Sequence, residues 1–213
     1  MKIKYIFFYI SILTIISFVV SCTEIRVTHS WKALEAGPNK FNKILVVGLL
    51  NNSERELRQQ MENHLQGDLE ELGFTAVTSI REYGPKSFEN MKEDDVMNKI
   101  ENGGIDAILS VVLLDRQRER YYVPGRVFYS PYYMRYNHFW GYYGVMYDRI
   151  YSPGYYQTST KYFWESNLYD LKTKKLLYSV QTESFDSDAA SRLAHQYGKK
   201  IISDLEKQGV LIK

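Results

Sequence analysis

Three short stretches with the character of strands, separated by two segments with helical periodicity, constrain the fold of this chain most strongly. The stretches are residues 43–50, 74–80 and 105–114. The first and third have the length and the Val and Ile content that are typical of strands buried on both faces. Strands joined by helices pair in parallel, because each crossover packs back over one face of the sheet. The first half of the chain therefore predicts a β-α-β-α-β unit.

The two segments between these stretches carry the signals of helices. In residues 53–72, apolar residues recur at helical spacing, and Gly73 follows as a candidate C-cap. Ser53 and Glu56 match a capping box at the start of that segment. A shorter helix is expected to begin near Asp94 or Asp95, because an acidic residue favours the positive end of a helix.

The second half of the chain predicts an antiparallel hairpin and a last helix. Residues 160–171 alternate in polarity, residues 172–174 form a turn, and residues 175–184 return as the second strand. Asp186 or Ser187 is expected to cap the helix that follows. The predicted fold class is α/β, with a single mixed sheet in the order β-α-β-α-β-(aromatic insertion)-β-β-α, parallel in the first half and with an antiparallel hairpin in the second.

An aromatic insertion, residues 121–160, interrupts this order. Thirteen of the 19 tyrosines lie in residues 121–162, whereas the aliphatic residues that a separate core needs are nearly missing. We interpret the insertion as an elaborated connection between two strands, such as an extended hairpin. Its rings are interpreted in three ways: as cover for the sheet, as a contact surface for another protein, or as rings that stack on an envelope polysaccharide. The candidate binding residues are Tyr132, Tyr133, Tyr136, Trp140, Tyr142 and Tyr143.

The first 22 residues have the pattern of an export signal. Two lysines precede an uncharged run, residues 5–20, and the sequence Val-Val-Ser-Cys ends at Cys22. This ending is similar to a bacterial lipobox, in which Cys22 is lipidated and becomes the first residue of the mature protein. A plain cleaved signal and an uncleaved anchor are the alternatives. The uncharged run is shorter than the roughly 20 residues of a spanning helix.

The predicted organisation is a signal peptide over residues 1–21, a lipidated tether over 22–42, in which Ile25 and Val27 form a short edge strand, and an α/β domain over 43–213. Removing 21 residues from 213 leaves 192, which is enough for one domain with a sizeable core. Two of the 27 basic residues are removed with the signal, so 25 basic residues balance 25 acidic ones. This neutral balance predicts no nucleic-acid partner.

No set of residues in the sequence forms a recognisable catalytic or metal-binding motif. The four histidines include no pair spaced by four on one predicted helix, and His64 and His195 are expected on predicted helices as surface or boundary residues. The sequence has no Gly-x-Ser-x-Gly elbow and no phosphate-binding loop. We therefore predict no catalysis, no cofactor and no metal. A hydrolase with dispersed catalytic residues stays open as an alternative.

Three stretches resemble those of an uncharacterised bacterial lipoprotein family, a domain of unknown function. They are the lipobox ending at Cys22, residues 43–47 (KILVV) and residues 167–179 (NLYDLKTKKLLYS) in the hairpin. Such families usually have Gly near Lys174, where the turn often needs a positive φ, so the turn type stays open. More distantly, the order of elements is similar to the α/β domains of the curli-secretion lipoprotein and of the lipoproteins that activate peptidoglycan synthases.

This resemblance implies an accessory role in the cell envelope and no catalytic residue. In Gram-negative relatives, Asp after the lipidated Cys holds the protein at the inner membrane, so Thr23 implies the outer membrane. The chain is thus expected to be lipid-anchored there, on the periplasmic side or exposed at the surface. Its expected partners are the membrane, through lipid on Cys22, and an envelope protein or polysaccharide. A glycan-binding module that uses the insertion is the alternative.

Overall fold

The computed structural model describes residues 25–38, 41–86, 88–123, 154–185 and 189–211. The strands are β1 (Arg26–Lys32), β2 (Lys43–Leu49), β3 (Thr75–Thr78), β4 (Ala107–Val123), β5 (Tyr155–Asp170) and β6 (Lys175–Phe185). The helices are the 3-10 turn η1 (Asn52–Glu54), α2 (Arg55–Glu71), α3 (Ser79–Tyr83), α4 (Glu93–Asn102) and α6 (Ala190–Lys207).

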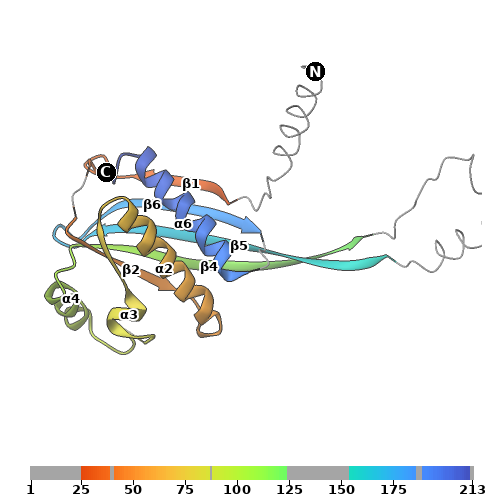
Figure 1. Cartoon of the computed structure of the whole chain (residues 1–213), viewed down its shortest axis with the longest axis horizontal. Coiled ribbons are helices and arrows are strands. Elements are labelled where there is room, and N and C mark those ends of the chain that lie inside the picture. Colours follow the sequence, from red (N-terminus) through yellow and green to blue (C-terminus); the bar gives the residue numbers. More distant parts are fainter. Residues whose placement is uncertain (1–24, 39–40, 87, 124–153, 186–188, 212–213) are drawn as a thin grey trace, which may run out of the picture.

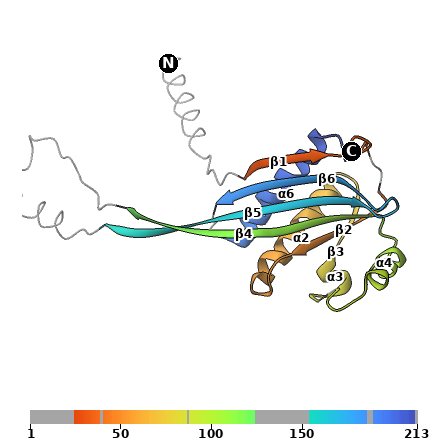
Figure 2. The same ribbon diagram turned by 180° about the vertical axis from the view of Figure 1, so that it is seen from behind.

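These strands form one six-stranded sheet with the order β1-β6-β5-β4-β2-β3. Strand β2 pairs in parallel with β3 and β4, whereas β4 with β5, β5 with β6, and β6 with β1 are antiparallel pairs. Helices α2 and α6 lie over one face of the sheet (Figure 1), and the opposite face of β1, β6, β5 and β4 is seen in front of them in Figure 2. The predicted α/β class, with its single mixed sheet, is confirmed.

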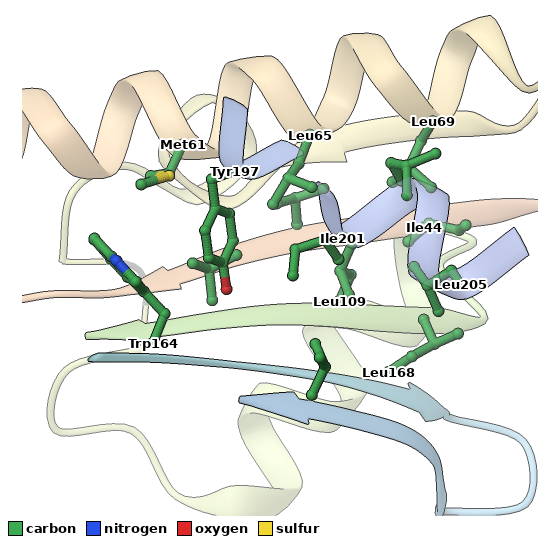
Figure 3. Packing of buried hydrophobic residues seen from close by; sticks show 14 of the residues in the cluster. Ile44, Met61, Leu65, Leu69, Leu109, Trp164, Leu168, Tyr197, Ile201 and Leu205 are labelled. Carbon is green, nitrogen blue, oxygen red and sulfur yellow. The ribbon is translucent and has the colours of Figure 1, made fainter. Parts of the chain in front are cut away.

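The main core lies between the sheet and helices α2 and α6. Side chains alternate along a strand. Ile44 and Val46 of β2 therefore join this core, whereas Leu45 and Val47 pack with Ile100 of α4 on the other face. Strand β2 is buried on both faces, as its continuous apolar run predicts. Figure 3 shows fully buried residues of the main core, including Ile44, Met61, Leu65, Leu69, Leu109, Trp164, Leu168, Tyr197, Ile201 and Leu205.

Helix α2 begins in a different way from the one that the sequence predicts. Ser53 lies inside η1, where its backbone N–H donates to Asn51 Oδ1 at 3.3 Å. Glu54 occupies the N-cap position of α2 and makes no side-chain capping hydrogen bond. The predicted capping box is therefore wrong, because the 3-10 turn displaces Ser53 from the cap. The C-cap residue of α2 is Leu72, and Gly73, the predicted cap, follows it with a φ of 92°, the left-handed conformation in which glycine commonly ends a helix.

Two other helix starts differ from expectation. Helix α3 replaces the end of the second predicted strand, because Thr78 Oγ1 accepts from the backbone N–H of Arg81 at 3.3 Å and caps a short helix. Helix α6 has Ala189 at its N-cap position. The predicted caps, Asp186 and Ser187, lie outside the described residues and do not directly precede the helix.

The segment expected to be a tether contributes a seven-residue strand, β1, to the sheet. Strand β1 extends the expected edge pairing and runs antiparallel to β6 from Arg26 to Lys32. Asp204 of α6 secures this edge, because its Oδ2 atom accepts from Ser30 Oγ of β1 at 2.7 Å and from Tyr178 Oη of β6 at 2.6 Å. The folded domain therefore begins before residue 43.

Candidate functional site

Strands β4 and β5 continue as a two-stranded ribbon beyond the part of the sheet that the helices cover (Figures 1 and 2). Strand β2 pairs with β4 only as far as Val112, and β6 ends opposite Lys161. Strands β4 and β5 stay paired with each other from Asp115 to Val123, which lies opposite Tyr155. A two-stranded ribbon contributes little stability of its own in water. This projection is therefore the candidate functional site.

The ribbon forms the beginning and the end of the aromatic insertion. Residues 121–123 pair antiparallel with residues 155–157, so the insertion connects two adjacent strands of the sheet, as predicted. Cys22 lies outside the described residues. The candidate binding residues Tyr132, Tyr133, Tyr136, Trp140, Tyr142 and Tyr143 also lie outside them.

Alternation of side chains gives the ribbon two chemically different faces. One face is on the side of α2 and α6, because its innermost member, Tyr162, packs against the main core and stacks on Trp164. We call it the arginine face. It is formed by Arg116, Arg118, Arg120, Tyr122, Tyr156, Thr158, Thr160 and Tyr162. The opposite face carries Asp115, Gln117, Glu119, Tyr121, Tyr155, Gln157, Ser159 and Lys161.

Contacts within the arginine face order its charged groups. Arg116 Nη1 donates to Glu54 Oε1 at 2.6 Å, which fastens the base of the ribbon to the start of α2. The guanidinium of Arg120 lies 4.4 Å from the centre of the Tyr156 ring. The Tyr156 ring in turn lies 5.2 Å from that of Tyr122. A guanidinium stacked in this way keeps its N–H groups available at its edge for an anionic ligand.

A hollow of about 190 Å³ lies at the base of the arginine face, where α2 and α6 begin. It is smaller than the roughly 300–1,000 Å³ of pockets that enclose small-molecule ligands. The ribbon thus offers an extended surface better suited to a large partner. The residues lining the hollow are Ser53, Glu54, Glu56, Leu57, Tyr162, Ala189, Ala190 and Leu193.

A second group of polar residues surrounds Glu62 of α2, whose side chain is fully buried. Its Oε1 atom accepts hydrogen bonds from Arg58 Nε at 3.1 Å and Ser79 Oγ at 2.8 Å. Two backbone N–H groups also donate to this carboxylate. The N–H of Gly48 donates to Oε1 and the N–H of Ile80 donates to Oε2, each at 2.9 Å. This carboxylate joins α2 to the end of β2 and the start of α3. The hydrogen bonds of Glu62 therefore stabilise the packing of these elements against one another.

His64 of α2 is half-buried and His195 of α6 is exposed, which agrees with their expected places at the surface or boundary of the helices, and the two side chains meet. The rings of His64 and His195 lie 5.4 Å apart. Asp68 follows His64 by one turn, and burial, followed by the charge of Glu71, raises its pKa, although both histidines act to lower it. Within the described ranges, no three His, Cys, Asp or Glu side chains are placed to hold a metal ion. Sequence spacing gives no signal for the meeting of His64 with His195, because the two histidines lie on separate helices.

No family model matches the chain, and no curated protein matches it. Among solved structures, a PelC dodecamer from Paraburkholderia phytofirmans is 13% identical, with 85% of this chain and 98% of that chain covered and a TM-score of 0.42. Lipoprotein GNA1162 from Neisseria meningitidis is 14% identical over 78% of this chain and 98% of that one, with a TM-score of 0.44.

A neuraminyllactose-binding hemagglutinin homologue from Helicobacter pylori is 10% identical over 82% of this chain and 90% of that one, with a TM-score of 0.40. These likenesses are too slight to assign the chain to a family. Among the helices that the structure describes, none is long and apolar enough to cross a membrane.

Proposed function

We propose that this chain is a lipid-anchored accessory protein of the cell envelope, which binds another envelope component through the β4–β5 ribbon and performs no catalysis. The projecting ribbon carries the proposal. Its tyrosines Tyr121, Tyr122, Tyr155 and Tyr156 are between 47% and 60% exposed and lie away from the core. Tyr and Arg are among the residue types enriched where binding energy concentrates in interfaces. Tyr offers a large contact area at a low entropy cost, and Arg offers several hydrogen-bond donors.

The lipid anchor is proposed from the lipobox pattern that ends at Cys22. Each buried CH₂ group of a lipid chain contributes about 0.8 kcal/mol to membrane binding, so several acyl chains hold a protein stably. Ile25 is already buried, and only two residues separate it from Cys22, a span of about 11 Å at full extension. The proposed anchor therefore holds the domain close to the membrane.

The anchor and the ribbon leave the domain at the same end of the sheet. Strand β1 begins at Arg26, opposite Glu183 near the end of β6. Strand β6 ends at Phe185, opposite Lys161, which is where the ribbon begins to project. An anchored domain thus presents its ribbon within reach of components at the membrane. This placement supports a contact with the envelope.

Fractionation of cells that express Cys22→Ala tests the anchor. We expect the variant in the soluble periplasmic fraction and the unchanged protein in the membrane fraction. Thr23→Ala is the matched control and is expected to stay in the outer membrane, whereas Thr23→Asp is expected to move to the inner membrane. Retention of Cys22→Ala in the membrane contradicts the proposed anchor.

A further inference from the structure

We propose that the arginine face of the ribbon binds an acidic polysaccharide, a linear glycan that bears carboxylates and lies along β4 and β5. This inference rests on the proposed function, because it names the chemical class of the envelope component that the ribbon takes.

The row of arginines on β4 is complementary in charge to an anionic ligand. Three arginines stand at alternate positions of β4, which places neighbouring side chains about 6.7 Å apart along one face. That face has no acidic residue of its own, and Glu54, which reaches its base from the start of α2, pairs with Arg116. No ion pair of the described residues involves Arg118, and Arg120 stacks on Tyr156. Two exposed guanidinium groups are therefore directed at the solvent with their donors available.

The type of anion follows from the geometry of the donors. A guanidinium presents two parallel N–H groups that match the two oxygens of a carboxylate. Arg118 and Arg120 place two guanidinium groups at successive positions on one face of β4. This spacing suits a polymer that carries repeated charges better than it suits a single small anion. Each contact alone is weak in water, but contacts that are linked along one chain reinforce one another.

The aromatic rings favour a glycan over other anionic polymers of the envelope. Tyr122 and Tyr156 are 53% and 60% exposed at the far end of the described face, and Tyr162 lies at its base. The apolar C–H face of a sugar ring can pack on such an exposed aromatic ring and bury apolar area there. The hydroxyl of Thr158 lies between them on the same face and adds a hydrogen-bonding group. The arginine face thus combines the three contacts that an acidic sugar chain uses.

The experiment titrates the full chain, extracted from membranes in detergent, with polygalacturonate and with dextran by isothermal calorimetry. We expect saturable binding of the acidic polymer that weakens as salt is raised, and no binding of the neutral one. Arg118→Gln combined with Arg120→Gln is expected to weaken binding at least tenfold, because each lost hydrogen-bonded charge contact accounts for about that factor. Tyr156→Ala is expected to weaken binding as well.

Lys172→Gln combined with Lys174→Gln is the matched control, because it removes the same net charge at the opposite end of the sheet. This variant should bind polygalacturonate as the unchanged protein does. Equal weakening by both double variants, or equal binding of dextran, overturns the inference. Circular dichroism melts of all variants show whether the fold is kept, and exposed substitutions of this kind usually leave stability nearly unchanged.

Two further outcomes also overturn the inference. Stronger binding to phosphatidylglycerol vesicles than to polygalacturonate assigns the arginine face to the membrane. A change of oligomeric state in light scattering on Arg118→Gln combined with Arg120→Gln assigns it to a second copy of the chain. Neither outcome contradicts the proposed function when an envelope component is still recovered through the ribbon. The binding role of the ribbon and its preference for an acidic polysaccharide are therefore tested separately.

Discussion

The carboxylate of Glu62 and the guanidinium of Arg58, one turn apart on α2, meet at 3.1 Å in the interior of the protein. The Glu62 side chain is completely buried, and that of Arg58 is 15% exposed. The same guanidinium also donates from Nη2 to Ser79 Oγ at 3.0 Å and from Nη1 to the carbonyl oxygen of Pro85 at 2.9 Å. One ion pair thus positions the end of β2, α3 and the loop after it against α2.

We predict that Glu62→Ala lowers the free energy of unfolding by about 3–5 kcal/mol, because it leaves a largely buried arginine without its partner. The change also strips acceptors from the backbone N–H groups of Gly48 and Ile80. Urea unfolding measures this loss. Glu70→Ala, on the exposed side of the same helix, is the control and should change stability by less than about 0.5 kcal/mol. Equal stability of the two variants contradicts this role of Glu62.

Lys174, in the turn between β5 and β6, has a φ of 57°, a conformation that glycine adopts without strain. The positive φ usual at this turn is therefore present here without glycine. Lys174→Gly should raise the free energy of unfolding by about 0.5–1 kcal/mol, because relief of strain outweighs the added entropy of the unfolded chain.

Lys172→Gly, two residues earlier in the same turn, is the control for Lys174→Gly. Lys172 is not among the residues with positive φ, so glycine there only adds unfolded-state entropy and should lower stability by about 0.5–1 kcal/mol. Both variants are measured by thermal and urea unfolding. A change of the same sign in both contradicts the assignment of strain to Lys174.

Stability should depend on pH through Asp68. Burial raises the pKa of this carboxyl above its ordinary value of 3.8. Between 3.8 and the raised value, the folded protein holds a proton that the unfolded chain has lost, so stability falls as pH rises through this window. Asp68→Asn does not titrate, so it does not lose stability in this pH window and should be more stable than the unchanged protein at pH 7. The difference should be less than about 1 kcal/mol, because solvent partly screens the site.

Urea unfolding at pH 7 and at pH 4 tests the role of Asp68. The advantage of Asp68→Asn should shrink at the lower pH, where Asp68 is increasingly protonated in both states. An advantage that stays constant between the two pH values contradicts a raised pKa for Asp68. Glu70→Gln, on the exposed side of α2, serves as a control for general effects of charge on stability.

The strands and helices with local signals could be predicted from the sequence. The apolar run of β2 and the helical spacing of apolar residues in α2 both arise because these residues are buried against neighbouring elements. The sequence shows this burial directly as hydrophobic periodicity. The paired strands of the β5–β6 hairpin were also visible, because the turn between them is local. Helix α3 was missed, since five residues are too few to show a helical period.

The ribbon and the edge strand β1 could not be predicted at their full extent. Residues 115–120 read DRQRER, a polar run with no pattern of burial, and they form a strand only because β5 pairs alongside them. Strand β1 pairs with β6 across about 150 residues of chain, a contact that local patterns do not record. For the same reason, the partners of Glu62 and the meeting of His64 with His195 were not foreseen.

The paired register of the ribbon allows it to be shortened cleanly. Arg118 lies directly opposite Thr160, so an Asn-Gly turn can replace residues 119–159 and close the hairpin there. The buried residues of the main core all lie outside the replaced segment. We therefore expect the melting temperature of the shortened protein to stay within a few degrees of that of the full chain. A large loss of stability shows instead that the ribbon supports the fold.

A crosslinked pull-down from native membranes, carried out with the full chain and with this shortened variant, tests directly whether the ribbon binds an envelope component. Both protein and carbohydrate in the recovered material are analysed. We expect an envelope component to be recovered with the full chain and to be absent with the shortened ribbon, while both proteins remain in the membrane fraction. Recovery of the same component in equal amount with the shortened ribbon contradicts a binding role for the ribbon.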